Sequence, residues 1–240
     1  MKGKLIVIVG PVGVGKSTVI NALSKVLSYE NVSVMKTFLK AFHGPCFVIW
    51  LLATKLINNK RKTIKLRKYA PWYILTKFNE VLARRIALLT SLLDATFTIP
   101  SKLLWINLLK RVGYVVLCEE YLYGTLIDYI YSLISIGNHK GKRLLRFTIA
   151  ILAAMLRKYK PSIVIALDAD ITEIIKRWEK RGYGDPQLKY VKFQRIFLKK
   201  LSYSETIFID TNNRSISEIV KLILKTLKKK DYLEALGERS

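Results

Sequence analysis

The residues best suited to chemistry form one glycine-rich stretch near the start of the chain. It reads Gly10-Pro11-Val12-Gly13-Val14-Gly15-Lys16-Ser17, and Thr18 follows it. This matches the P-loop pattern G-x-x-x-x-G-K-[ST], in which backbone N–H groups surround phosphate oxygens and the next helix adds its dipole. In such a loop Lys16 reaches the β- and γ-phosphates, and the Ser17 hydroxyl coordinates Mg²⁺. The motif therefore predicts that residues 10–18 bind ATP with Mg²⁺.

Apolar runs alternate with helical patterns along the rest of the chain and must position this loop. Predicted strands cover 4–9, 32–39, 114–118, 162–167 and 206–209. Predicted helices cover 15–28, 45–58, 69–93, 101–111, 125–136, 142–158, 171–181, 186–201 and 215–228, and Ser101 is a candidate N-cap after Pro100. This alternation predicts an α/β, three-layer P-loop NTPase fold, with a parallel five-stranded sheet and helices on both faces. Residues 1–228 then form one domain, followed by a polar tail at 229–240.

Charged side chains gather where several predicted strands end. Ligands bind at the carboxyl ends of parallel strands. His43 follows the second strand, Glu119 and Glu120 the third, and Asp168 and Asp170 the fourth. We expect Glu119 to bind Mg²⁺ directly or through water, with Glu120 as the second choice. The alternative is a pair of solvated acids at a strand end.

These residues resemble the thymidylate kinase-like branch of the P-loop nucleoside monophosphate kinases, over most of 1–228. Residues 118–128 resemble that family's Asp-Arg-Tyr segment, and 161–182 resemble its fourth strand and lid helix. The resemblance implies transfer of the ATP γ-phosphate to a nucleoside monophosphate, most simply dTMP. It also implies a lid at about 171–190, a basic helical acceptor side at about 40–111, and a possible homodimer. One departure stands out. Glu119-Glu120 replaces the family's Asp-Arg pair, so the arginine expected on the acceptor phosphate is missing.

Arg177 and Arg181 are spaced i to i+4 and so share one helix face. The resemblance makes that helix part of the lid, where the two arginines would join Lys16 and Glu119 in stabilising phosphoryl transfer. The alternative is a surface face paired with Glu173 or Glu179.

The acceptor side offers several candidates without a clear choice among them. Lys36, Lys40 or Arg84 could replace the missing arginine, and His43, Tyr121 and Glu120 could touch the acceptor. Three aromatic residues could stack on a base or pack in a helix core instead: Trp72, Tyr73 and Phe78.

The charge balance suggests polyanionic partners. The chain has 42 Lys and Arg against 17 Asp and Glu, for a formal net charge of +25, and 31–79 holds ten basic residues and no acidic one. A nucleic-acid-binding ATPase or polynucleotide 5′-kinase is therefore an alternative function. A second is a non-catalytic nucleotide-binding protein whose region 45–85 docks on an anionic membrane surface. A solvated basic face explains the charge equally well.

Cysteine usage and the first residues point to a cytoplasmic protein. Cys46 and Cys118 lack metal-ligand spacing and are expected to be buried thiols. The apolar run after Lys4 spans only five residues, too short for a signal peptide.

Overall fold

A computed structural model describes residues 3–59, 71–136, 141–182, 187–200 and 206–229. The densest basic run, at 60–68, lies outside the described residues. So do 183–186 of the expected lid and 230–240 of the expected tail.

The centre of the molecule is the predicted five-stranded parallel sheet, and its strands lie in the order β2-β3-β1-β4-β5. Its strands are β1 (Leu5–Val9), β2 (Val34–Phe38), β3 (Val115–Glu119), β4 (Ile163–Asp168) and β5 (Thr206–Asp210). Helices cover both faces of the sheet, so the central strands are almost wholly apolar and buried.

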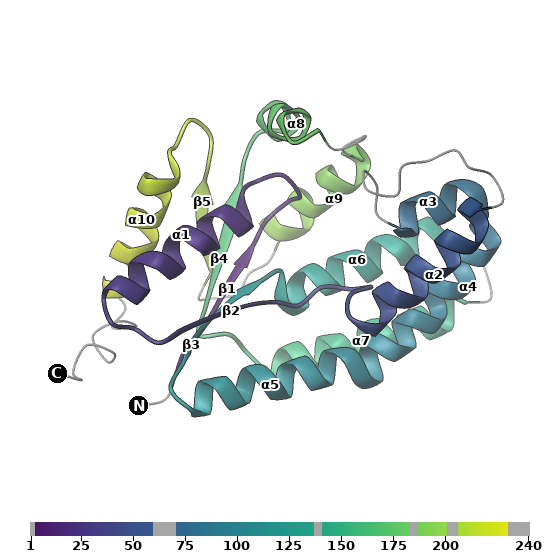
Figure 1. Cartoon of the computed structure of the whole chain (residues 1–240), viewed down its shortest axis with the longest axis horizontal. Helices are drawn as coiled ribbons and strands as arrows, with labels where there is room; N and C mark the ends of the chain where they lie inside the picture. Colours follow the sequence, from purple (N-terminus) through teal and green to yellow (C-terminus); the bar gives the residue numbers. More distant parts are fainter. Residues whose placement is uncertain (1–2, 60–70, 137–140, 183–186, 201–205, 230–240) are drawn as a thin grey trace.

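Two hydrophobic cores lie on opposite faces of the sheet. One joins the sheet to α1 (Lys16–Tyr29) and α10 (Ile216–Lys229), with a contact from α8 (Ile171–Lys180). The other joins it to α5 (Ile99–Arg111), α6 (Tyr121–Ile136), α7 (Lys142–Lys158) and α9 (Leu188–Lys199). Figure 1 shows α1 and α10 on one side of the strands and α5, α6 and α7 on the other. The result is the expected three-layer arrangement.

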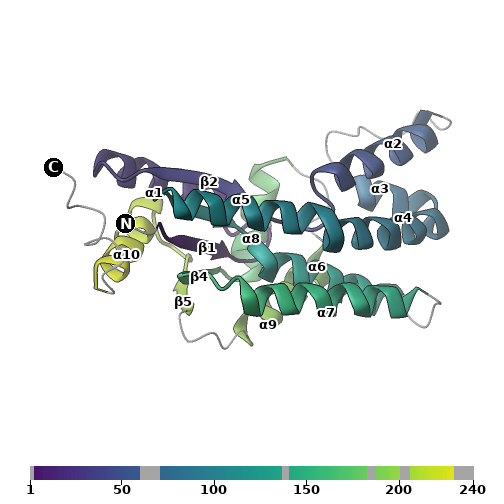
Figure 2. The same cartoon turned by 90° about the horizontal axis from the view of Figure 1, so that it is seen from below.

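A second group of helices extends beyond the sheet. It comprises α2 (Pro45–Asn59), α3 (Pro71–Phe78) and α4 (Glu80–Leu93). Figure 2 shows β2 pointing toward this group, which therefore lies beyond the carboxyl ends of the strands. Asn79 separates α3 from α4, because its side chain caps α4 by accepting a hydrogen bond from the Leu82 N–H at 3.0 Å. The single helix predicted over 69–93 is therefore wrong.

Residues 80–111 form one long helix in which α4 passes through a π-helical turn, Asp94–Thr98, into α5. Ser101 lies inside α5, so its prediction as an N-cap is wrong. A proline inside a helix clashes with the carbonyl of residue i−4. The wider turn just before Pro100 lets the helix continue. Among the described helices, only this one has the length and hydropathy of a membrane span. However, 39% of its apolar window is buried in the protein, as in a core helix.

Candidate active site

The P-loop holds its lysine against the protein's own backbone. Gly13 and Gly15 adopt φ of 92° and 101°, a left-handed conformation that glycine takes without strain. The Lys16 ammonium donates to the carbonyls of Gly10 at 2.8 Å and Pro11 at 3.0 Å. The same nitrogen lies 3.0 Å from Glu120 Oε1, so all three of its donors have partners.

Ser17 and Glu119 come together at the start of α1. The Ser17 hydroxyl donates to both carboxylate oxygens of Glu119, at 3.1 and 2.9 Å. A hydroxyl and a carboxylate are oxygen ligands of the kind Mg²⁺ takes, one or two at a time, with nucleotide phosphates completing the shell. Within the described residues no three His, Cys, Asp or Glu side chains cluster as a metal site. The pair therefore fits a Mg²⁺ that is shared with a nucleotide.

Glu120 turns inward where β3 ends. Glu120 and Tyr121 have φ of 67° and 55°, an uncommon conformation for non-glycine residues that tends to be kept at functional sites. This turn buries the Glu120 carboxylate, which pairs with Lys16 and, at 3.8 Å, with Lys40. Burial alone would raise the pKa of Glu120, but the two ammonium groups outweigh it and lower that pKa. Glu120 therefore stands ionised between two lysines.

Lys40 shares its partner Glu120 with the P-loop lysine, Lys16. Burial opposes its charge, yet Glu120, Asp128 and Glu119 together raise the pKa of Lys40. Its charge is thus already balanced by carboxylates of the protein.

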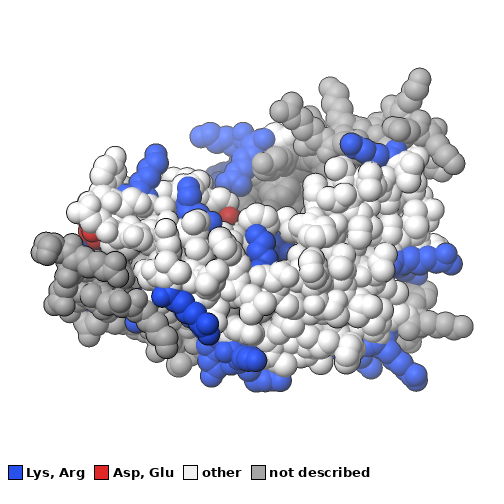
Figure 3. Space-filling model, turned by 60° about the horizontal axis from the view of Figure 1, so that its bottom comes forward, with Lys and Arg blue, Asp and Glu red and all other residues white. Residues whose placement is uncertain are grey.

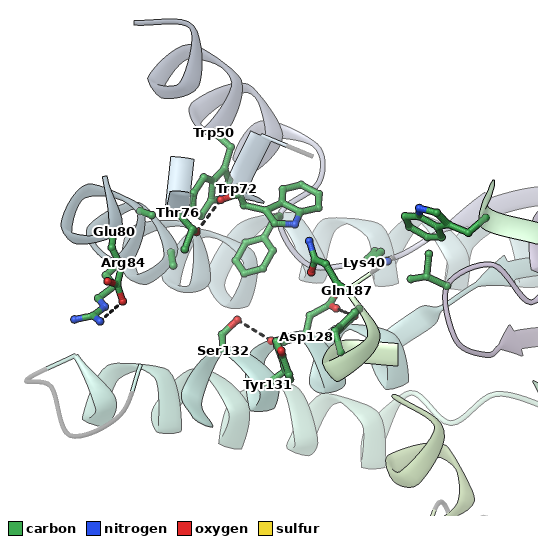
Figure 4. A pocket seen from close by; sticks show the side chains of 16 residues that line it. Lys40, Trp50, Trp72, Thr76, Glu80, Arg84, Asp128, Tyr131, Ser132 and Gln187 are labelled. Atoms are coloured by element: carbon green, nitrogen blue, oxygen red, sulfur yellow. Dashed lines mark hydrogen bonds and ion pairs between the residues drawn. The ribbon is translucent and has the colours of Figure 1, made fainter. Parts of the chain in front are cut away.

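A pocket of about 540 Å³ opens between the P-loop and the second helical group (Figure 4). Phe42, Trp50 and Trp72 form an aromatic wall, and Val12 of the P-loop belongs to the same lining. Lys40, Asp128, Glu80 and Arg84 supply its charged groups, and Glu80 pairs with Arg84. A phosphate donor on the loop and a molecule in this pocket would therefore be neighbours.

Asp128 is a pocket residue that sequence reasoning missed. One of its oxygens accepts a hydrogen bond from the Tyr190 hydroxyl. The Gln194 amide donates to that hydroxyl at 3.0 Å, while its oxygen accepts from the Val12 N–H at 3.0 Å. Burial raises the pKa of Asp128 to about 6. The sequence does contain one indication of this role, because Asp128 is the one charged residue in helix α6.

A second buried carboxylate, Asp94, fixes the loop after β2. It accepts hydrogen bonds from the Phe42 N–H at 2.9 Å, the Tyr129 hydroxyl at 2.5 Å and the Cys46 thiol at 3.1 Å. Phe42 has a φ of 63° and is held there by this contact. Burial raises the pKa of Asp94. Asp94 therefore positions one wall of the pocket, a role that no local sequence pattern indicates.

The two arginines of α8 differ in their surroundings. Arg177 is half-buried and donates to the carbonyls of Val14 at 3.1 Å and Thr211 at 2.8 Å, as well as to Glu173. Arg181 is the exposed C-cap residue. Arg177 thus ties α8 to the P-loop and to the end of β5.

The remaining acceptor candidates lie in different places. Lys36 bonds Asn21 at 2.9 Å, and Tyr121 is buried with its hydroxyl on the Tyr159 carbonyl at 2.6 Å. His43 bonds the Ala41 carbonyl at 2.7 Å, and burial lowers the pKa of its imidazole. None of these three belongs to the pocket lining, whereas Trp72 does. The side chain of Tyr73 lies outside the described residues.

The acids at the end of β4 pair with Arg195 of α9 and with Asn212 after β5. Asp168 accepts two hydrogen bonds from Arg195, at 2.8 and 3.0 Å, and the Asp170 N–H donates to the Asn212 side chain at 2.9 Å. These polar side chains border a second pocket, of about 580 Å³, at the carboxyl ends of β4 and β5.

Basic residues lie apart on the surface. Figure 3 shows Lys and Arg side chains scattered around one face, with little acidic surface between them. The described part of this face shows no continuous basic track.

The comparisons with known proteins agree with this architecture. A thymidylate kinase structure from Candida albicans matches over 96% of this chain and 93% of its own, with a TM-score of 0.58 and 18% sequence identity. No protein-family model and no curated protein sequence matches the chain.

Proposed function

From this thymidylate kinase-like fold, we propose that the chain is an ATP-dependent phosphotransferase of the nucleotide-kinase class, with its acceptor in the aromatic pocket. The main support for this proposal is that Val12 of the P-loop belongs to the pocket lining. Phosphoryl transfer depends on positioning and charge neutralisation more than on covalent catalysis. A loop for the triphosphate and an adjoining cavity for the acceptor supply the positioning.

The described residues divide the work among themselves. When ATP binds, Lys16 gives up hydrogen bonds to the Gly10 and Pro11 carbonyls, or its contact with Glu120, and contacts the β- and γ-phosphates instead. The backbone N–H groups of 13–18 donate to the phosphate oxygens. Ser17 and Glu119 would hold Mg²⁺, which when bound neutralises phosphate charge. Arg177 keeps α8 against the loop, and Arg181 lies at the exposed end of that helix.

The test is ADP formation from ATP with Mg²⁺ against a panel of acceptors. The panel holds nucleoside monophosphates with dTMP first, nucleosides, and 5′-hydroxyl oligonucleotides. Lys16→Ala is the blank, because the lysine contacts the transferred phosphate. We expect acceptor-dependent turnover that Lys16→Ala removes. Turnover equal in the two proteins, or none with any acceptor, would contradict the proposal.

A further inference from the structure

The charges around the pocket do not suit a phosphomonoester. Its described lining carries two cations, Lys40 and Arg84, and two acids, Glu80 and Asp128. Glu120 stands behind Lys40 at 3.8 Å, and Glu80 pairs with Arg84. A monophosphate dianion would therefore enter a region without excess positive charge. Moving a dianion from water into such a region costs free energy, because no net positive charge replaces its hydration.

The pocket also contains a buried carboxylate oxygen that receives no hydrogen bond from any residue that the structure describes. Asp128 is only 8% exposed, and within the described residues its Oδ2 has no hydrogen-bond partner, while Oδ1 is taken by Tyr190. A buried acceptor atom left without a donor costs about 1–3 kcal/mol. A ligand that brings a hydrogen-bond donor would recover that cost. At the reacting group, a phosphate dianion brings no donor to this atom, whereas an alcohol brings its hydroxyl.

The rest of the lining favours a planar, mostly apolar body. Phe42 packs at centroid distances of 5.8 Å from both Trp50 and Trp72. Figure 4 shows Trp50 and Trp72 across the pocket from Asp128. Aromatic faces stack well on the rings of nucleobases. A cavity of about 540 Å³ has the size of a small-molecule site.

We infer that the acceptor is an uncharged nucleoside-type alcohol, whose hydroxyl donates a hydrogen bond to Asp128 Oδ2. This rests on the proposed phosphotransferase function and narrows its acceptor. It departs from the monophosphate acceptor implied by the resemblance, and Glu120 in place of arginine is the sequence change that accompanies it.

In the reaction the hydroxyl oxygen forms a bond to the γ-phosphorus of ATP. The bond from that phosphorus to the β–γ bridging oxygen breaks, and ADP leaves with that oxygen. The hydroxyl proton passes to the Asp128 carboxylate and from there to solvent. The products are ADP, a phosphomonoester and one proton, so atoms and charge balance.

The first test compares products. Each acceptor is incubated with ATP and Mg²⁺, and ³¹P NMR distinguishes a new phosphomonoester, made from a nucleoside, from a new diphosphate, made from a monophosphate. We expect kcat/KM for the best nucleoside to exceed that for its own 5′-monophosphate at least tenfold. The reverse order would overturn the inference and leave the phosphotransferase function standing. Absence of Lys16-dependent turnover with every acceptor would overturn both.

The second test concerns Asp128 itself. Asp128→Asn keeps the side-chain size but cannot take the proton, so we expect kcat to fall about a hundredfold while the affinity for ATP stays within twofold. The matched control is Glu30→Gln, because Glu30 is an exposed carboxylate paired with Lys228. This substitution should change neither kcat nor the affinity for ATP. An Asp128→Asn protein with wild-type kcat would overturn the role of Asp128, and so would a defect confined to KM.

The pH profile separates this role from a structural one. Groups facing Asp128 are Lys40, Tyr190, Glu120 and Lys16, from four different elements. In the wild type kcat/KM should rise with pH through about 6, because only the carboxylate form accepts the proton. Asp128→Asn should lack that limb. A rise of kcat/KM near pH 6 that persists in the variant would contradict proton transfer to Asp128.

Phosphorylation of 5′-hydroxyl oligonucleotides in preference to free nucleosides would overturn the inference that the acceptor is a small molecule.

Discussion

The Glu120 carboxylate lies 3.0 Å from the Lys16 ammonium, so the P-loop lysine is already paired with a buried acid of the protein. Nucleotide phosphates need the same ammonium, whose other two donors hold the carbonyls of Gly10 and Pro11. Glu120 and ATP therefore compete for one cation. Lys40, the second partner of Glu120, remains to balance the acid when Lys16 is drawn away.

Glu120→Gln should tighten ATP binding. The amide removes the competing negative charge, so Lys16 and Lys40 offer more net positive charge to the phosphates. We expect Kd for ATP to fall about tenfold, which corresponds to about 1.4 kcal/mol. Titration calorimetry measures it. The thermal midpoint should fall at the same time, because two buried ammonium groups lose their counter-charge.

Glu30→Gln is the control for this substitution, since it removes an equal charge from an exposed site. It should leave both Kd and thermal midpoint unchanged. Weaker ATP binding by Glu120→Gln would show that Glu120 helps to place Lys16 for phosphate, not to compete for it.

Arg177→Ala should destabilise the protein, whereas Arg181→Ala should not. Arg177 satisfies the carbonyls of Val14 and Thr211, and its removal leaves polar groups without partners. We expect a loss of about 2 kcal/mol in the free energy of unfolding, measured by chemical denaturation. Arg181 is exposed, and its loss should cost less than about 0.5 kcal/mol. Equal effects of the two substitutions would contradict this division.

The sheet and the P-loop were predictable because their signals are local. Each predicted strand overlaps the observed one. The three central strands, β1, β3 and β4, are buried on both faces, and such apolar runs can be recognised from consecutive residues. The alternation of strands with helices predicted that the sheet is parallel, whereas the order β2-β3-β1-β4-β5 came from the structure. The meeting of Ser17 with Glu119 followed from the rule that parallel strands end at one edge.

The pocket was less predictable because it depends on distant contacts. Asp94 and Phe42 are separated by 52 residues and joined by one hydrogen bond, and no periodicity reports such a pair. Asp128 contacts Tyr190 across 62 residues. Similarly, the helix continues through Pro100 because the preceding turn widens, and that turn is stabilised by tertiary contacts of Asp94.

Asp94→Ala should cost more stability than Asp94→Asn. Alanine leaves the Phe42 N–H and the Tyr129 hydroxyl without an acceptor inside the core, so we expect a loss of about 3 kcal/mol in the free energy of unfolding. Asparagine keeps one acceptor oxygen and should lose about half as much. Denaturation with urea measures both. A loss below 1 kcal/mol for alanine would show that Asp94 does not fix this loop.

The free energy of unfolding of Asp128→Asn, relative to that of the wild type, should increase as the pH rises. Burial raises the pKa of Asp128 to about 6, against about 4 in the unfolded chain. Between these values the folded state binds more protons than the unfolded one, so this carboxyl lowers stability as pH rises from about 4 to 6. Asparagine does not titrate. The difference in unfolding free energy, variant minus wild type, should therefore grow by about 2 kcal/mol from pH 4 to pH 7. The same difference for Glu30→Gln should change by less than 1 kcal/mol, because that carboxylate is exposed. Denaturant titrations of the three proteins at pH 4, 5, 6 and 7 measure it, and a flat difference for Asp128→Asn would show that Asp128 ionises as freely in the fold as in water.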